Sequence, residues 1–258
     1  MTKFTVVTIV FLLILAFVMV FSTGAPGLVL AASICLAYLI VLGIGVSFIK
    51  LNFFTKAFSR GNPSEKTVAL TYDDGPDPEN TPRLLDELSK LQVKASFFCI
   101  GENVEKHAGL ITQMADEGHL VCNHTYRHGR WTNFLTPGKL AAEISRTAES
   151  IEKITGERPA FYRPPMGLTN PRTAKAAKTT GSAVVGWDVR GLDRKATSPG
   201  KTIKRITGKA RNGSIIALHD SGVDGKVMIA VLREIVDNLR KRGFTFVRID
   251  ELYSQREA

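Results

Sequence analysis

Two long apolar runs at the N-terminus constrain this chain more than any other feature. Residues 1–49 contain one charged side chain, that of Lys3. The runs cover residues 4–21 and 28–49, and each is close to the roughly 20 residues that an α-helix needs to cross a bilayer core. We therefore expect residues 1–49 to form two membrane-spanning helices, which would make this a multi-pass protein of the cell membrane.

A cleaved signal peptide followed by a single span is the alternative interpretation of the two runs. Cleavage near Thr23-Gly24-Ala25 would leave Pro26 directly after the cut, and the small-residue pattern there is poor. Two uncleaved spans would place both outer ends on one side of the bilayer. Lysines and arginines flank these ends and the 22–27 loop has none, so the positive-inside rule predicts that the rest of the chain is cytoplasmic.

The part of the chain after position 49 is long enough for one domain with a sizeable core, at about 210 residues. The formal net charge is +10, but the lysines and arginines are scattered and no basic run alternates with aromatic residues. This pattern argues against a nucleic-acid partner, and we interpret the charge as solubility together with attraction to anionic lipid. The oligomeric state is not defined by the sequence.

Beyond position 66, short apolar runs alternate with helical segments. The runs that predict strands cover residues 67–72, 95–100, 119–123, 182–189, 214–219 and 244–249. The segments with helical patterning cover residues 81–91, 107–117, 137–155, 171–180, 202–211 and 226–242. This alternation predicts a parallel sheet covered by helices, either open and doubly wound or closed into a barrel. We divide the chain into an anchor at 1–49, a turn-rich juxtamembrane linker at 50–66 and one α/β domain at 67–258.

Adjacent carboxylates end the first predicted strand, in Thr71-Tyr72-Asp73-Asp74-Gly75. On extended backbone they point in different directions, so one can bind a metal while the other faces a water molecule beside it. An ordinary acidic turn is the alternative, because Asp-Gly-Pro is common in turns. Reactive side chains also follow several other predicted strands, which favours a barrel because barrel enzymes build their sites there.

Two histidines four residues apart, His124 and His128, follow the third predicted strand. A helical turn there would direct both imidazoles to one point, at a spacing that suits zinc. With one aspartate they would form a three-ligand site with open positions, as in catalytic metal centres. Unrelated surface histidines are the alternative. His219 and Arg163 also follow strands, although alone they have ordinary explanations as a capped core histidine and a surface ion pair.

Taken in order, these motifs resemble the five motifs of the polysaccharide deacetylases, the NodB-homology domain of carbohydrate esterase family 4. The motifs are Thr71-Tyr72-Asp73-Asp74-Gly75, His124-Thr125-Tyr126-Arg127-His128, Arg163-Pro164-Pro165-Met166-Gly167, the 187–193 segment, and His219 with its neighbours. The resemblance spans about residues 66–252. It implies a distorted (β/α) barrel and metal-dependent removal of N-acetyl groups from an amino-sugar glycan, whether peptidoglycan, chitooligosaccharide or a lipid-linked sugar.

The resemblance also implies roles for individual residues. Asp74, His124 and His128 would hold zinc or another divalent ion such as cobalt. Asp73 would be the general base, oriented by Arg163. His219 would be the general acid, held in position by Asp193. The residues expected to contact substrate are Trp187 and Leu218, which would line the acetyl methyl pocket, Pro165, and Tyr126, whose amide could donate to the oxyanion.

One position departs from the family pattern, because Arg194 follows Asp193 where many members have tryptophan. Asp188 is therefore a second candidate, besides Asp193, for the residue that orients His219. An arginine near the cleft could favour an anionic glycan or a lipid pyrophosphate as substrate. Hydrolysis of another amide such as an N-formyl group, and glycan binding without catalysis, are the competing functions. The resemblance suggests a catalytic domain outside the cell, against the positive-inside rule, so the side of the membrane stays open.

Overall fold

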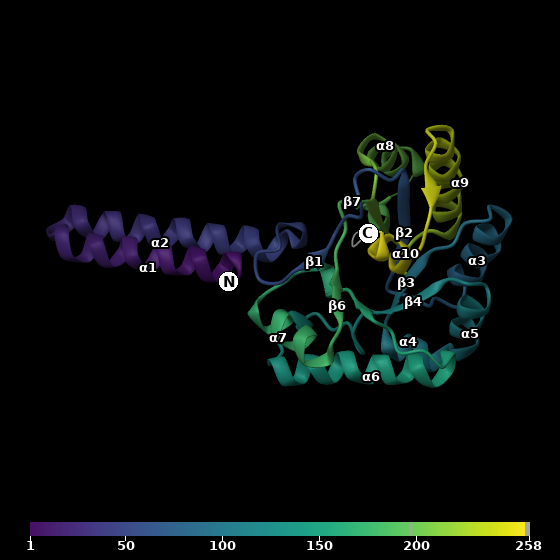
Figure 1. Ribbon diagram of the computed structural model, residues 1–258, viewed down its shortest axis with the longest axis horizontal. Coiled ribbons are helices and arrows are strands. Elements are labelled where there is room, and N and C mark those ends of the chain that lie inside the picture. The colour runs from purple at the N-terminus through teal and green to yellow at the C-terminus, as the bar shows by residue number, and fades with distance from the viewer. Residues whose placement is uncertain (197, 256–258) are drawn as a thin grey trace.

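The computed structural model describes residues 1–196 and 198–255, so the last residues of the expected 67–258 domain lie outside the described part. The N-terminal runs form two helices, α1 (Lys3–Phe21) and α2 (Gly24–Ser47). They lie side by side as a rod that projects from the rest of the molecule (Figure 1). At 1.5 Å per residue, their 19 and 24 residues give lengths of about 28 and 36 Å, close to the thickness of a bilayer core.

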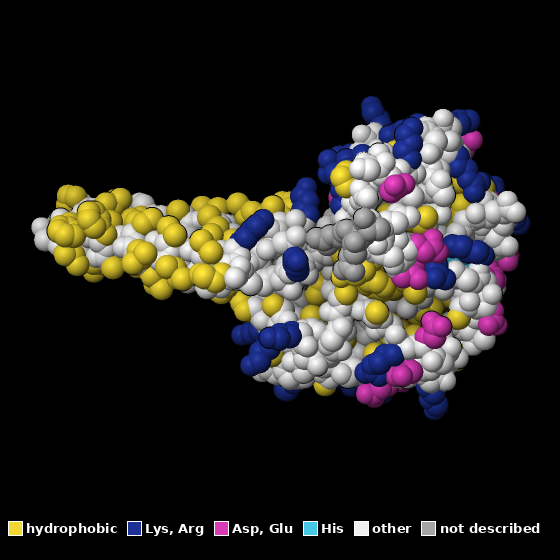
Figure 2. Space-filling view, viewed as in Figure 1, with side chains coloured by type: hydrophobic (Ala, Val, Ile, Leu, Met, Phe, Trp, Pro, Cys, Tyr) yellow, Lys and Arg dark blue, Asp and Glu magenta, His cyan; other side chains and the backbone are white. Residues whose placement is uncertain are grey.

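The rod exposes many large apolar side chains. Leu13 is 65% exposed and Phe17 is 62% exposed, and Figure 2 shows hydrophobic side chains along the full length of the projection on the face in view. Between the helices, the rings of Phe11 and Tyr38 stack at 4.0 Å and the Thr8 hydroxyl lies 2.8 Å from that of Tyr38. Soluble monomers rarely expose so large an apolar surface.

The rest of the chain is built on one sheet of parallel strands, with nine strands within the described residues. The strands are β1 (Ala57–Phe58), β2 (Thr67–Asp73), β3 (Ser96–Cys99), β4 (Leu120–Asn123), β5 (Phe161–Tyr162), β6 (Ala183–Val185), β7 (Val189–Arg190), β8 (Ser214–His219) and β9 (Thr245–Phe246). Their order is β1-β6-β5-β4-β3-β2-β8-β7, and β9 also pairs with β2.

The sheet curls into a distorted barrel. Strands β6 and β7 lie near opposite ends of the strand order, yet only residues 186–188 separate them along the chain. The Gly186 amide donates to Phe58 in β1 and the Asp188 amide donates to Ile215 in β8, so this short connector joins the two ends. The predicted fold is confirmed, although the strand predicted at 182–189 divides in two and β5 was not predicted.

Helices cover the outer face of the sheet (Figure 1). They are α3 (Asn80–Lys90), α4 (Gly101–Lys106), α5 (Ala108–Asp116), α6 (Pro137–Thr155), α7 (Pro171–Thr180), α8 (Pro199–Lys209) and α9 (Gly225–Lys241). The last helix, α10 (Ile249–Ser254), packs Ile249 and Leu252 against the core inside the barrel. Along β2, Val68, Leu70 and Tyr72 pack in the core beneath the helices, whereas Ala69 belongs to a second core inside the barrel. Because side chains alternate along a strand, Asp73 faces the interior with Ala69.

The segment expected as a linker contributes to the barrel. It contains β1 and the last two residues of the short helix η1 (Ile49–Leu51), and Phe53 and Phe54 are buried. The Phe4 amide donates to the Phe53 carbonyl at 3.0 Å, so the start of α1 is held against this segment. The hairpin is therefore joined to the barrel by a packed segment. The boundaries at residues 49 and 66 mark changes in amino-acid composition along the chain.

Candidate active site and metal centre

The site lies at the carboxyl ends of the central strands. The parallel register of β2 and β8 places Asp73 opposite His219, and that of β2 and β3 places Asp73 opposite Phe98. Neighbouring strands are about 4.8 Å apart, so the fold brings a carboxylate and an imidazole together from positions far apart in sequence. Both side chains are buried, with 5% and 8% of their residue surface exposed.

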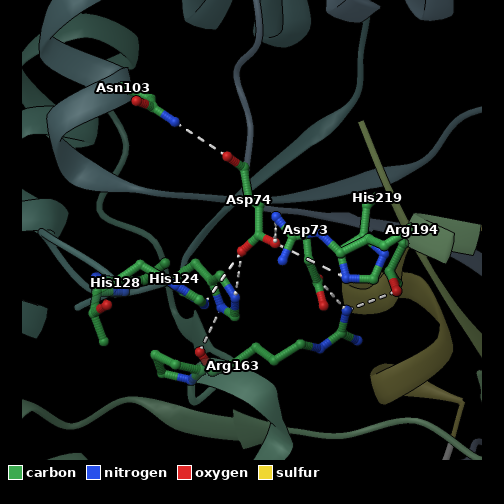
Figure 3. A network of polar contacts seen from close by, with 12 residues as sticks. Asp73, Asp74, Asn103, His124, His128, Arg163, Arg194 and His219 are labelled. Carbon is green, nitrogen blue, oxygen red and sulfur yellow. Dashed lines mark hydrogen bonds and ion pairs between the residues drawn. The ribbon is translucent and has the colours of Figure 1, made fainter. Parts of the chain in front are cut away.

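Asp74, His124 and His128 converge as the sequence predicted. The Nε2 atoms of both histidines lie 3.3 Å from Asp74 Oδ1, and the three ligand atoms lie within 4.8 Å of one another. Figure 3 shows the two imidazoles directed at the carboxylate. The predicted helical turn between the histidines is wrong. The left-handed backbone of Thr125 (φ 67°) and His128 (φ 49°) bends this loop instead.

Hydrogen bonds prepare these side chains to bind a cation. The His124 Nδ1–H donates to the Arg163 carbonyl at 2.8 Å, which leaves Nε2 unprotonated and free to coordinate. Burial and the nearby His124 lower the pKa of His128, although Asp74 acts in the opposite direction. Burial raises the pKa of Asp74, but the neighbouring side chains of His124, His128 and Arg194 outweigh it and the net pKa is lowered.

The backbone of Asp74 holds its carboxylate in place. Asp74 has a left-handed φ of 76°, which is costly for a residue other than glycine and is found mostly where function requires it. Its amide donates to the Phe98 carbonyl at 3.2 Å, and its carbonyl accepts from Asn103 Nδ2 at 3.1 Å. Contacts from β3 and α4 therefore fix the residue that starts the metal site.

A divalent cation fits this donor set. Asp74 Oδ1 is buried and has no hydrogen-bond partner, a state that is unfavourable for a carboxylate oxygen unless a cation binds it. One carboxylate and two imidazoles form a three-ligand centre with positions left for water and substrate. The chain therefore has a divalent-metal site formed by Asp74, His124 and His128.

Arg163 is fully buried beneath Asp73. One guanidinium nitrogen donates to Asp73 Oδ1 at 2.6 Å and to the Thr71 hydroxyl at 2.8 Å, and the other donates to the Gly186 carbonyl at 3.0 Å. The guanidinium also lies 3.9 Å from the ring centroid of Phe98. A fully buried cation is stable only when it is paired in this way, and the pairing fixes which oxygen of Asp73 faces the site.

Asp193 and not Asp188 contacts His219. Asp193 accepts two hydrogen bonds from His219, from the backbone amide at 2.8 Å and from Nδ1–H at 2.9 Å. Asp188 accepts from the Ser214 hydroxyl and the Ile215 amide, each at 3.0 Å. Burial alone lowers the pKa of His219, but the hydrogen bond and charge of Asp193 outweigh it and raise the pKa. Nε2 of His219 faces the metal site, 3.9 Å from Asp74 Oδ2.

Arg194, the departure from the family pattern, enters the same site. Its guanidinium lies 3.1 Å from Asp74 Oδ2, while 47% of its side chain is exposed (Figure 3). Among the described residues, Arg194 forms an ion pair with the carboxylate of Asp74. A divalent ion on Asp74 would repel this guanidinium, which would then face an incoming substrate.

The residues expected to contact substrate have mixed positions. Trp187 lies beside Arg163, with 5.5 Å between its ring and the guanidinium. Leu218 packs in the core beneath the helices, so by alternation Ala217 and not Leu218 shares the interior face of His219. The Tyr126 amide donates to Glu143 at 3.1 Å, which argues against our expectation that it faces an oxyanion. Pro165 is buried, and its carbonyl accepts from Asn133.

Features that the sequence did not single out follow two of the site motifs in the chain. Met166 follows Pro165 with a left-handed φ of 58°, is 49% exposed, and its amide donates no hydrogen bond within the described residues. Trp131 and Phe134 lie just after His128, are 67% and 66% exposed, and pack edge to face at 5.6 Å. The sequence signal that could have drawn attention to this segment is the presence of two aromatic residues in a polar loop after a metal ligand.

Comparisons with known proteins agree with this geometry. The family model for polysaccharide deacetylases matches residues 60–185. A peptidoglycan-N-acetylglucosamine deacetylase of Bacillus cereus is 37% identical over 191 residues, which are 73% of this chain and 89% of the relative. The peptidoglycan-N-acetylmuramic acid deacetylase PdaA of Bacillus subtilis is 35% identical over 205 residues, 78% of this chain and 76% of the relative.

Solved structures share the fold. The crystal structure of the Bc1960 peptidoglycan N-acetylglucosamine deacetylase superposes with a TM-score of 0.72 at 34% identity, over 76% of this chain and 91% of that one. A pseudoenzyme of carbohydrate esterase family 4 from Bacillus anthracis, BA3943, gives a TM-score of 0.71 at 26% identity. The match covers 78% of this chain and 69% of the BA3943 chain. This chain belongs to the polysaccharide deacetylase family. It is a metal-dependent carbohydrate deacetylase.

Proposed function

We propose that this protein removes N-acetyl groups from an N-acetylated amino-sugar glycan, with Asp73 as general base and His219 as general acid. The observation that carries the proposal is the pairing of Asp73 and His219 across adjacent strands, next to the metal site. The amino-sugar names of the relatives support the same substrate class for this chain.

The metal supplies one part of the chemistry. A divalent ion held by Asp74, His124 and His128 would polarise the acetamide carbonyl and lower the pKa of the attacking water. We propose zinc, or another ion such as cobalt, because two imidazoles and one carboxylate are typical ligands of such ions. Buried, fixed ligands avoid reorganisation when the ion binds.

Asp73 takes the proton of the attacking water in this proposal. Arg163 holds Oδ1 of Asp73 at 2.6 Å, so Oδ2 is the oxygen left to accept that proton. The guanidinium would keep the carboxylate oriented toward the attacking water, as a general base requires. The unpaired Met166 amide is the candidate second donor to the negative oxygen that develops on the acetamide.

His219 donates a proton to the leaving amine. Its Nδ1–H is bound to Asp193, so Nε2 is the atom that faces the reacting group. The raised pKa of His219 favours the imidazolium form, which carries this proton. Without that proton the amine would leave as a poor, anionic group.

The pseudoenzyme interpretation is less well supported. The metal ligands, the candidate base and the candidate acid are all present, and each has the contacts that its role requires. Arg194 could give preference to a glycan with an anionic group, because its guanidinium borders the metal site and is half exposed. Hydrolysis of an N-formyl group would use the same residues.

We further propose that the apolar hairpin anchors the protein in a membrane. Both helices are long and apolar enough to span a bilayer, although an N-terminal signal sequence has the same character. The packed junction at Phe53 and Phe54 favours a retained anchor, because cleavage would expose buried side chains of the barrel.

Acetate release tests the proposed reaction. The full-length protein, reconstituted with zinc in detergent, should release acetate from N-acetylglucosamine tetramer and from N-acetylmuramic acid-containing fragments, and chelation should abolish this release. The N-formyl analogue of the tetramer serves as the competing substrate. Faster release of formate than of acetate would reject the proposed acyl group, and no release of either would favour a glycan-binding role.

A further inference from the structure

A basic cavity lies where the apolar hairpin meets the barrel. It has a volume of about 280 Å³, and its lining includes Ser47 and Phe48 at the end of α2 together with Trp187 of the barrel. Four cationic side chains border it, from Lys50, Arg190, Arg205 and Lys209. Figure 2 shows Lys and Arg side chains gathered around the base of the apolar rod.

These four cations have no carboxylate partner among residues 1–196 and 198–255. Asp188 also lines the cavity, but it is engaged by Arg211 at 3.4 Å and by the Ser214 hydroxyl and Ile215 amide. A cavity bordered by several cations without carboxylate partners attracts an anion. Long, flexible lysine and arginine side chains can then move to contact the bound anion. The guanidinium of Arg190 lies 5.5 Å from the centroid of the Trp187 ring, and this contact holds the side chain at the cavity.

The position of the cavity identifies the kind of anion. The last residues of α2 line it, so a bilayer that contains the hairpin would end at this level. Lipid phosphates lie at that depth, just outside the hydrocarbon core. We propose that this cavity binds the phosphate group of a membrane lipid. The proposal rests on insertion of the hairpin and goes beyond the deacetylation reaction, because binding requires no hydrolysis.

The cavity and the active site share a wall. Leu192 lines the cavity, and the next two residues are Asp193, which holds His219, and Arg194, which contacts Asp74. A second cavity of about 200 Å³ continues past Leu192 and Arg205 to Lys201. A sugar joined to the bound phosphate would therefore lie close to the metal centre. A bulk anionic phospholipid in the same place would instead orient the barrel on the bilayer.

Lipid binding to the full-length protein in detergent micelles tests the proposal. The probe is a C15 prenyl monophosphate, with phosphatidylglycerol and inorganic phosphate as separate arms. The variant Arg205→Gln/Lys209→Gln removes two cations of the cavity without touching the catalytic residues. Loss of two charge-assisted contacts should weaken lipid-phosphate binding by about tenfold or more.

The control variant Lys204→Gln/Lys175→Gln removes two exposed cations that do not line the cavity. It should change binding by less than about twofold, because diffuse surface charge contributes little to a specific site. Tighter binding of the prenyl phosphate would identify a lipid-linked sugar carrier, and tighter binding of phosphatidylglycerol a bulk lipid. Equal weakening in both variants, no binding, or equally tight binding of inorganic phosphate would overturn the proposal. Failure of deacetylation would leave this measurement unaffected.

Discussion

Replacing Asp193 with asparagine tests the proposed acid most sharply. Asp193 accepts two hydrogen bonds from His219, one from the backbone amide and one from Nδ1–H. Asparagine has one acceptor oxygen and one donor nitrogen, so one of these two donors must face an NH₂ group. A buried donor without an acceptor costs about 1–3 kcal/mol. If that cost falls on the protonated imidazole, kcat drops by about 5- to 150-fold.

The pH profile separates this role from general damage. In the wild type, Asp193 holds the pKa of His219 above its ordinary value of 6.5, so the protonated acid persists to higher pH. Without the carboxylate, burial remains and lowers the pKa, so the alkaline limb of kcat/KM should move to lower pH. The assay is acetate release from N-acetylglucosamine tetramer across the pH range, with zinc-loaded protein.

Asp188→Asn is the matched control. Asp188 also accepts from a side chain and from a backbone amide of β8, but it does not touch His219. The control variant should lose similar stability and keep the alkaline limb in place. A shift of that limb in Asp188→Asn, or none in Asp193→Asn, would refute the assignment of Asp193.

Substitutions at three further positions probe the fold and the cleft. Arg163→Lys keeps the charge but cannot hold Asp73 and the Gly186 carbonyl together, so kcat should fall by about 10²-fold through misplacement of the base, with metal content unchanged. Trp131→Ala should raise KM for the tetramer by about tenfold at constant kcat, and Trp131→Phe should restore it. Hydrogen bonds from Arg233 lower the pKa of Glu87 below 4.5, so Glu87→Gln should lower Tm at pH 7, and the difference should vanish as pH falls through the lowered pKa.

The parts of the fold that follow from periodicity could be predicted from sequence. The apolar helices and the strand at β2 have long, regular patterns, and their residues form the expected elements. Strands β1 and β5 have two residues each, too few for any period to be visible. The break between β6 and β7 falls where Gly186 and Asp188 interrupt the apolar run. A glycine inside a strand pattern fits a bulge as well as a break, so the pattern did not show where the barrel closes.

The site could be predicted in its residues but not in its backbone. Residue type and order indicated Asp74, His124 and His128, yet the loop that joins the histidines is not helical. Left-handed conformations at Thr125 and His128 have no sequence signal, since glycine is the usual residue there. The Leu218 side chain points into the core beneath the helices, as strand alternation requires, whereas the family resemblance had led us to expect it in the acetyl methyl pocket.

The most direct test of the central claim is acetate release by zinc-reconstituted Asp73→Asn together with its metal content. Asparagine keeps the shape of the side chain and can still face Arg163, but it cannot accept a proton. The three metal ligands are untouched, so the variant should bind one equivalent of metal, as in the wild type. Turnover should fall by about 10²- to 10⁴-fold, the usual contribution of a general base. Wild-type turnover in this variant would contradict the proposed mechanism.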